Sequence, residues 1–281
     1  MPLNNITSWF AGGFERCQAG TIDSAGYFTG STGTPAATTG TGMLQLVGAS
    51  AASVPSPQAR SITPEGDDGK LGTIMLSSIE TIQFELSLKA LNQTFAALVQ
   101  GSLNYAEEEW TFLHFDPDTP TYRNMCLLFS RKAQSKVSAS PGQGYEHLLL
   151  PSCQISFNGV GQLATGANEA TYNYSVTVDR ATKTPWGRTL SLTNDGTVAS
   201  SGVVFFTESR FSMHAFVGDN SDVSVVVDYT PTSSTLNTNN LVYVDGTKIT
   251  ADVTISSKTF TWSVAPTTAA KVVIAYEHSQ S

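Results

Sequence analysis

The side chains that most often do chemistry in proteins are few and scattered in this chain. Its four histidines, His114, His147, His214 and His278, lie far apart in the sequence. None of them belongs to an HExxH zinc motif, and no GxSxG serine motif occurs. His114 and His214 each lie in a run of alternating apolar and polar residues, which is typical of ordinary strand residues.

Cysteine chemistry has equally little support. Cys153 lies close after His147, but nothing in the sequence around it indicates the lowered thiol pKa that a cysteine nucleophile needs. With Cys17 and Cys126 it makes an odd number of cysteines at wide spacing, without a CxxC pair or a zinc pattern. Because free cysteine prefers the protein interior, we expect three buried, reduced thiols.

Carboxylates cluster at two places. Glu65, Asp67 and Asp68 in the segment PEGDDG offer the oxygen ligands that Ca²⁺ prefers, but the EF-hand spacing is absent, and a solvated acidic turn is the alternative. Glu107, Glu108 and Glu109 are three like charges in a row, as suits a solvated strand end. No spacing indicates a catalytic pair, and no phosphate-binding loop occurs. The sequence therefore predicts neither an enzyme nor a bound metal or cofactor.

The composition indicates a neutral polar surface. The chain has 281 residues, of which 40% are hydrophobic. Only 14% are charged, compared with about 25% in typical soluble domains. Such a surface suits close packing of subunits, because few charges must be desolvated, but it suits an extracellular or virion surface as well. The net charge of −8 argues against affinity for nucleic acid, although an acidic wall would let DNA pass without binding it.

Neither a signal peptide nor a membrane span is predicted. The first residues, MPLNNITSWF, lack the basic and apolar regions of a signal peptide. The longest apolar runs are far shorter than the ~20 residues that a membrane helix needs. We therefore expect a protein that is made in a cytosol and is soluble there.

Most of the chain alternates apolar and polar residues, as strands of a half-buried sheet do. The clearest cases are Glu80 to Leu88 and Thr171 to Asp179. The Asp245-Gly246 pair between VYV and TKI predicts a hairpin with a type I′ turn, which needs two positive φ angles. Many short strands at this spacing indicate a β-sandwich.

One amphipathic helix interrupts the strands. Leu88, Leu91, Phe95, Leu98 and Val99 form a single apolar stripe at helical spacing. Ser87 is the expected N-cap and Gly101 the expected end. We expect the apolar stripe to pack against the sandwich.

A long polar segment, residues 26–72, separates the first strands from the helix region. It is rich in Thr, Ser, Gly, Pro and Ala, a composition that cannot bury enough apolar surface on its own to offset the entropy of the chain. A short apolar patch in its middle is the exception, with Met43, Leu44, Leu46 and Val47. This patch could pair as an edge strand or dock on a neighbouring molecule, and a mobile surface loop with a sticky middle is the alternative.

The order of these features resembles the major tail tube proteins of long-tailed bacteriophages. The features are the polar loop, then IQFELSLKALNQTFAALVQGS, and later LLLPSCQISFNGVG and ANEATYNYSVTVDR. The resemblance covers residues 1–186. Beyond a change of composition at Thr182 to Arg188, residues 187–281 look like the immunoglobulin-like module that several members of that family carry at the C-terminus.

The resemblance implies a fold, partners and a location. The fold would be mainly all-β, a tail-tube β-sandwich or barrel with one flanking helix and a long loop, plus an immunoglobulin-like β-sandwich. Copies would form hexameric rings, stacked into the tail tube of a virion, and would contact the tape measure, terminator and baseplate proteins. Viral DNA would pass through without specific binding. Glu107, Glu108, Glu109 and Asp179 could then line the channel, and Met43, Leu44, Leu46 and Val47 could contact the next ring.

Three alternatives remain open. The chain could be another tail component that shares the tube fold, such as a terminator or a baseplate ring. It could be a carbohydrate-binding or adhesive β-sandwich in which Trp186, Trp262 or Tyr243 stacks on sugars, although single aromatic residues on strands more often belong to a core. It could also be a hydrolase on a β scaffold, for which no pair of carboxylates is evident.

Overall fold

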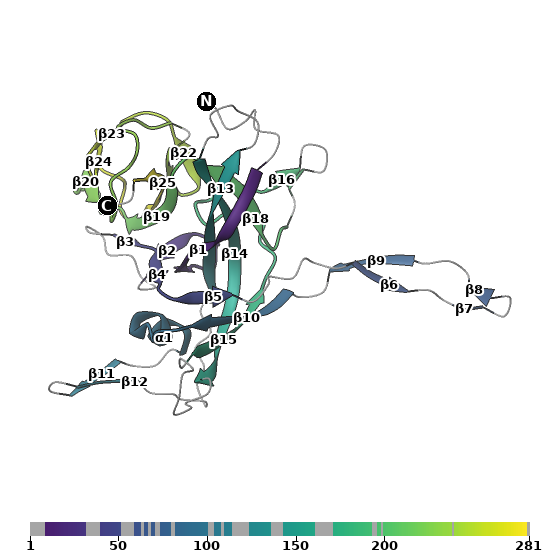
Figure 1. Cartoon of the computed structure of the whole chain (residues 1–281). Helices are drawn as coiled ribbons and strands as arrows, with labels where there is room; N and C mark the ends of the chain where they lie inside the picture. Colours follow the sequence, from purple (N-terminus) through teal and green to yellow (C-terminus); the bar gives the residue numbers. More distant parts are fainter. Residues whose placement is uncertain are drawn as a thin grey trace.

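The computed structural model describes residues 9–31, 40–51, 59–62, 65–66, 69–70, 74–79, 82–100, 104–107, 110–113, 124–135, 143–160, 171–192, 196–197, 199–237 and 239–279. Within these residues the chain consists mostly of antiparallel strands with one helix (Figure 1). The predicted all-β fold is therefore confirmed.

The largest sheet has nine strands. Their order is β2-β1-β13-β14-β15-β10-β5, with β4 paired to β1 and β18 paired to β14 beside this path. The strands are β1 (Trp9–Ile22), β2 (Phe28–Gly30), β4 (Leu44–Leu46), β5 (Ala49–Ala51), β10 (Ile82–Leu88), β13 (Asn124–Ser135), β14 (Gln143–Val160), β15 (Tyr172–Val178) and β18 (Val203–Thr207).

The predicted alternation in this sheet is confirmed. In β10 the apolar residues Ile82, Phe84, Leu86 and Leu88 are buried, whereas Gln83 and Glu85 are exposed. Strand β15, paired with β10, likewise buries Tyr174, Val176 and Val178. Strands β1 and β10 are far apart in the sheet order but contribute to one core. The sheet therefore curves around that core.

The helix α1 (Gln93–Gln100) packs on the same core. Phe95, Leu98 and Val99 of the predicted stripe are buried, and the Phe95 ring meets the Tyr174 ring edge-on with centroids 4.9 Å apart. The prediction of one helix with its apolar face on the sheet is confirmed for these residues.

The helix begins later than predicted. Ser87 is not its N-cap, because Ser87 still belongs to β10, and its hydroxyl donates to Asn173 Oδ1 on β15 at 2.8 Å. The backbone N–H of Phe95 instead donates to Asn92 Oδ1 at 3.0 Å, which makes Asn92 the N-cap. Sheet pairing holds the chain extended through Leu88, so helical spacing at Leu88 and Leu91 does not produce helix there.

Two further sheets lie in the C-terminal part of the chain. One has five strands in the order β22 (Thr247–Ile249), β21 (Asn240–Val244), β25 (Lys271–His278), β19 (Arg210–Val217) and β3 (Thr41–Gly42). The other has three, in the order β20 (Ser224–Val226), β24 (Thr259–Trp262) and β23 (Val253–Ser256). Their facing apolar residues form a shared core, so the two sheets pack as layers. Asp245 and Gly246 have φ angles of 48° and 77° between β21 and β22, as the predicted type I′ turn requires.

The expected boundary at residue 187 lies between two apolar clusters, one within residues 17–178 and the other within residues 216–276, but the two parts also exchange strands and share a third cluster. Strand β3 belongs to the expected first domain but pairs with β19, and β18 belongs to the expected second domain but pairs with β14. A single apolar cluster lies between the nine-stranded and five-stranded sheets and draws on both sides of residue 187: Phe28, Met43, Cys126, Leu128, Leu149, Trp186, Phe211, Met213, Ala215, Tyr243, Val273 and Ala275. Residues 1–186 and 187–281 therefore fold against each other.

Four two-stranded sheets complete the described part of the fold. They are β6 (Ala59–Ile62) with β9 (Ile74–Ile79), β7 (Glu65–Gly66) with β8 (Gly69–Lys70), β11 (Asn104–Glu107) with β12 (Trp110–Leu113), and β16 (Ser191–Leu192) with β17 (Gly196–Thr197). Figure 1 shows β6–β9 and β7–β8 reaching outward from the body in one direction, and β11–β12 in another. The polar segment 26–72 is thus not one structureless loop, since strands β2 to β8 lie within it.

Candidate functional site: assembly surfaces and a cleft beside β18

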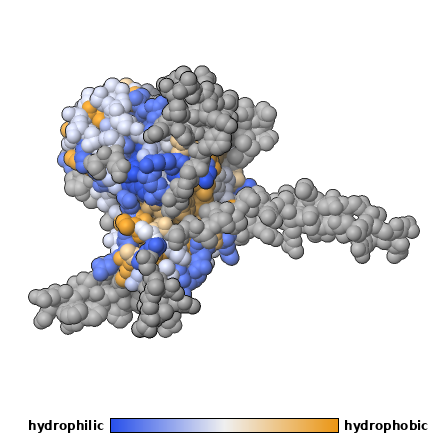
Figure 2. Space-filling view, in the orientation of Figure 1, coloured by the Kyte–Doolittle hydropathy of each residue, from blue (hydrophilic) through white to orange (hydrophobic). Residues whose placement is uncertain are grey.

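The apolar patch of the polar segment is mostly used inside this chain. Leu44 to Leu46 form β4, which pairs with β1 as the edge-strand interpretation predicted. Met43 and Leu46 are 6% and 3% exposed and belong to cores, and Leu44 packs beside one of them. Met43 and Leu46 are therefore not available to a neighbouring subunit in this conformation, because their own core surrounds them. Val47 is 66% exposed and stays a candidate contact. Figure 2 shows apolar surface near β4.

The projecting part of the polar segment is the β6–β9 hairpin, called here the arm. Ala59 pairs with Ile79 at its base, and Ile62 pairs with Ile74 further out. Among the described strands, β6 and β9 pair only with each other. The acidic segment lies beyond them, where Glu65 begins β7; Asp67 and Asp68 lie outside the described residues.

The predicted acidic lining is divided between two places. Glu107 ends β11, where it pairs with Trp110, while Glu108 and Glu109 lie outside the described residues. Asp179 follows β15 and donates its backbone N–H to Ser152 O at 2.9 Å. Asp179 therefore lies beside the first residue of β10. Glu107 lies in β11, which comes after the helix that follows the opposite end of β10. A common lining by these residues stays a prediction.

The three cysteines are buried and unpaired, as expected. Burial raises the pKa of the Cys126 thiol to about 12, and it raises the pKa of Cys17 and of Cys153 as well. Burial therefore favours the protonated thiol at all three positions. This is the opposite of the lowered pKa that a cysteine nucleophile requires.

Both ring nitrogens of His147 are occupied by hydroxyl groups. Nδ1 lies 2.8 Å from Ser130 Oγ and Nε2 lies 2.7 Å from Thr207 Oγ1. Thr207 donates its own proton to Ser209 O, so it accepts from Nε2–H, and Ser130 donates to Nδ1. This chain of hydrogen bonds joins β13, β14 and β18 around a neutral ring, and burial lowers the pKa of His147 to about 3. His147 is thus a satisfied core residue and does not act on Cys153.

The aromatic residues considered for sugar stacking are in cores. Trp186, Trp262 and Tyr243 are 7%, 7% and 6% exposed. The core interpretation of these residues is confirmed, and they do not offer an exposed stacking surface.

Sequence reasoning missed a cleft of about 520 Å³ beside β18, between the nine-stranded and five-stranded sheets. Its middle is aromatic: the Phe205 and Phe211 rings have centroids 5.0 Å apart, and Trp186 lies 5.8 Å from Phe211. His147 stacks on Phe205 at 4.9 Å. These contacts hold the rings in place, so the cleft is preformed. No signal in the sequence could indicate it, because β18, β19 and the segment around Trp186 meet only in the folded chain.

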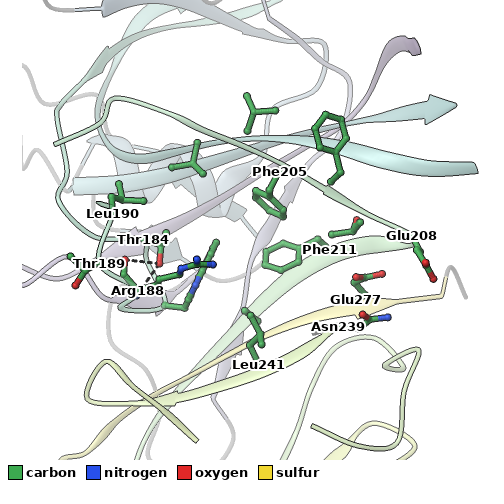
Figure 3. A pocket seen from close by; sticks show the side chains of 16 residues that line it. Thr184, Arg188, Thr189, Leu190, Phe205, Glu208, Phe211, Asn239, Leu241 and Glu277 are labelled. Atoms are coloured by element: carbon green, nitrogen blue, oxygen red, sulfur yellow. Dashed lines mark hydrogen bonds between the residues drawn. The ribbon is translucent and has the colours of Figure 1, made fainter. Parts of the chain in front are cut away.

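The two ends of the cleft carry opposite charges. Figure 3 shows Glu208, Glu277 and Asn239 at one end and Thr184, Arg188 and Thr189 at the other, with Phe205 and Phe211 between them. The cleft can therefore hold a molecule whose middle is apolar and whose two ends are polar.

Glu277 is the buried charge of this cleft. It is 5% exposed, and its Oε2 accepts the backbone N–H of Ser209 at 3.0 Å. Burial, and to a smaller extent the neighbouring Glu208, raises the pKa of Glu277 to about 7 in spite of that hydrogen bond. In the described part of the chain, no lysine or arginine forms an ion pair with Glu277.

Two properties of the described residues concern metals and membranes. They contain no group of three or more His, Cys, Asp and Glu side chains that could hold a metal ion. Their helix is too short to cross a bilayer.

No protein-family model matches the chain, and no match is found among curated proteins.

Proposed function

We propose that this chain is a structural subunit of a bacteriophage tail tube. Copies form hexameric rings that stack into a tube, and viral DNA passes through the tube without being bound specifically. The subunit acts through its surfaces in the virion, together with tape measure, terminator and baseplate proteins.

The arm is the observation that carries this proposal. A two-stranded hairpin that extends away from the body leaves the outer edges of both strands without a partner strand in the described part of the chain (Figure 1). Isolated hairpins are marginally stable in water, and open strand edges favour pairing with another molecule. Contact with the next ring would supply the missing partner. This is the role that the resemblance implies for the long loop.

The sheet and the surface composition agree with this role. The nine-stranded sheet ends in β5, a three-residue strand. Closing several such sheets into one ring would cover their edges and remove a site of unspecific aggregation. The net charge of −8 suits a channel that repels DNA, and the small proportion of charged residues suits subunit packing.

Negative-stain electron microscopy of the concentrated protein tests the proposal directly. We expect hollow tubes or stacked rings with an open central channel, formed spontaneously or after addition of a tail initiator complex. A protein that stays monomeric with and without the initiator would contradict the proposal.

Shortening the arm should block stacking and leave the fold intact. Because Ala59 and Ile79 pair at the base of the arm, residues 60–78 can be replaced by an Asn-Gly turn. A deletion that reached back to residue 40 would remove β3, β4 and β5 and would take Met43 and Leu46 out of the two cores to which they belong. We expect a folded monomer by circular dichroism that forms no tubes in the microscope.

The control for the arm deletion is Lys258→Ala. Lys258 lies in the C-terminal part, where it donates to Asp228 O, and this variant should polymerise as the unaltered chain does. Tubes of normal length from the shortened arm would show that the arm is not the inter-ring contact.

A further inference from the structure

We infer that the cleft beside β18 binds a ligand with an apolar body, a cationic group at one end and a carboxylate or carbonyl group at the other. A short peptide segment and a free amino-acid-like molecule share this chemistry. The inference does not depend on tube formation, because the cleft lies within one copy of the chain.

The size and lining of the cleft fit such a ligand. Its volume of about 520 Å³ lies within the ~300–1,000 Å³ of typical ligand sites, which are mostly apolar with a few polar groups. Phe205 presents a half-buried ring that is already held by Phe211, Trp186 and His147. A ligand would therefore gain apolar contact without having to order these side chains.

Glu277 determines the charge of one ligand end. A carboxylate that is 5% exposed and has no ion pair with a described cation is costly to keep ionised. A ligand ammonium or guanidinium group would remove that cost by pairing with it, and the exposed Glu208 at the rim adds attraction of the same sign. The acidic end therefore selects a cation.

Arg188 determines the charge of the other end. Its backbone is fixed by two hydrogen bonds to Thr184: Thr184 N–H donates to Arg188 O at 2.8 Å, and Arg188 N–H donates to Thr184 Oγ1 at 3.0 Å. The tight turn between them uses Gly187, whose φ is 95°. The guanidinium group is thus carried on a rigid turn at the rim, where it can bind a carboxylate or carbonyl oxygen.

Nuclear magnetic resonance of the full-length chain tests the inference with two probes. The tripeptide Lys-Phe-Gly carries both ends and an aromatic middle, whereas phenethylamine carries only the cation and the ring. The indole N–H signal of Trp186, one of four tryptophans, is assigned by its loss in Trp186→Phe and reports on the cleft. We expect saturable shifts with a dissociation constant in the range of about 1 mM or tighter.

Matched variants separate the two ends of the cleft. Glu277→Gln keeps an oxygen for the Ser209 N–H and removes the charge, so it should weaken both probes by about tenfold. Arg188→Ala, at an exposed position, should weaken the tripeptide and leave phenethylamine unchanged. Glu85→Gln on the exposed face of β10 is the control and should change neither.

The results distinguish a peptide ligand from a small amino-acid-like ligand, and they can also refute the proposed site. Binding of both probes supports a site that recognises a cation next to an apolar body in either kind of ligand. Binding of the tripeptide alone supports a peptide as the ligand. Absence of saturable shifts at about 10 mM probe would overturn the inference. Equal binding by the unaltered chain and by Glu277→Gln would also overturn it, and if Glu277→Gln does not fold, the Arg188→Ala result decides in its place.

Discussion

At the scale of single residues, His147 shows how a strand histidine becomes part of a core. Its ring lies between Ser130 and Thr207 and stacks on Phe205, so both ring nitrogens have a hydrogen-bond partner and the ring has an aromatic contact. A buried neutral imidazole is stable only while it stays neutral, because charging it would require burying a cation. The residue that invites a catalytic interpretation in the sequence is thus a structural one.

His147 should make the protein sensitive to acid. Its pKa is lowered to about 3 in the folded chain, compared with about 6.5 in an unfolded one. Between these pH values the folded state therefore binds fewer protons than the unfolded state. The stabilising contribution of the neutral His147 ring is complete above pH 6.5 and is lost as the pH falls toward 3. We expect a loss of about 3 kcal/mol between pH 7 and pH 4 from this residue, measured by urea unfolding at several pH values.

The variant His147→Gln tests this origin of the acid sensitivity. It should flatten the dependence of unfolding free energy on pH over this range, whatever its effect on stability at pH 7. Burial also lowers the pKa of His278, to about 4. In His147→Gln this residue should leave a smaller pH dependence of the unfolding free energy, with the same sign. An unchanged slope in His147→Gln would show that other groups cause the acid sensitivity.

At the scale of elements, the passage from β10 to α1 shows how sheet pairing and helix formation compete. Leu88 fits both the strand alternation and the helical stripe, and the pairing of β10 with β15 decides in favour of the strand. The chain then bends at Lys89 and Ala90, and Asn92 begins the helix with a side-chain cap. The eight-residue helix depends on this cap and on its apolar face, since short helices are not stable alone.

Removal of the cap should weaken this region. Asn92→Ala removes the acceptor of the Phe95 N–H and the donor to Gln45 O, and should cost about 1 kcal/mol of unfolding free energy. Asn92→Asp keeps the capping oxygen and loses only the donor, so it should stay close to the unaltered chain. Denaturant unfolding followed by circular dichroism measures both, and equal losses in the two variants would mean that the contact with Gln45 matters more than the cap.

At the scale of the whole molecule, the core between the two large sheets joins the parts of the chain. Met43 comes from the polar segment, Cys126 from β13, and Met213 from β19, yet they belong to one apolar cluster. Arg16 of β1 also reaches the C-terminal strand, donating to His278 Nε2 at 3.1 Å. The C-terminal part is therefore fixed to residues 1–186 by a shared apolar cluster and by this hydrogen bond.

A shared core predicts that the two parts unfold together. Calorimetry of the full chain should show one cooperative transition, and Met213→Ala, which empties a fully buried position, should lower the stability of that single transition by about 2–5 kcal/mol. Val226→Ala, at a position 59% exposed, is the control and should have little effect. Two separate transitions, of which Met213→Ala shifts only one, would contradict a common core.

The sequence by itself determined the local features of this protein. These features are the alternation in β10 and β15, the turn at Asp245-Gly246 and the apolar face of α1. They depend on the types and spacing of residues that are neighbours in the chain, so they can be predicted from the sequence directly. The burial of the cysteines follows from their residue type in the same way. The tail-tube function remains a proposal, because it concerns contacts between copies of the chain.

Only the tertiary structure decided which distant segments meet. Residues far apart in the chain meet in several places. Strand β3 pairs with β19, and β18 pairs with β14. Met43 and Leu46 are buried in cores, and Glu277, Arg188 and Phe205 line one cleft. These contacts form because they bury apolar surface, and the free energy gained depends on the whole folded chain. A local sequence pattern therefore does not show which distant segments pair. The end of β10 shows the same effect within a few residues, since the partner strand β15 decided where the strand stopped and the helix began.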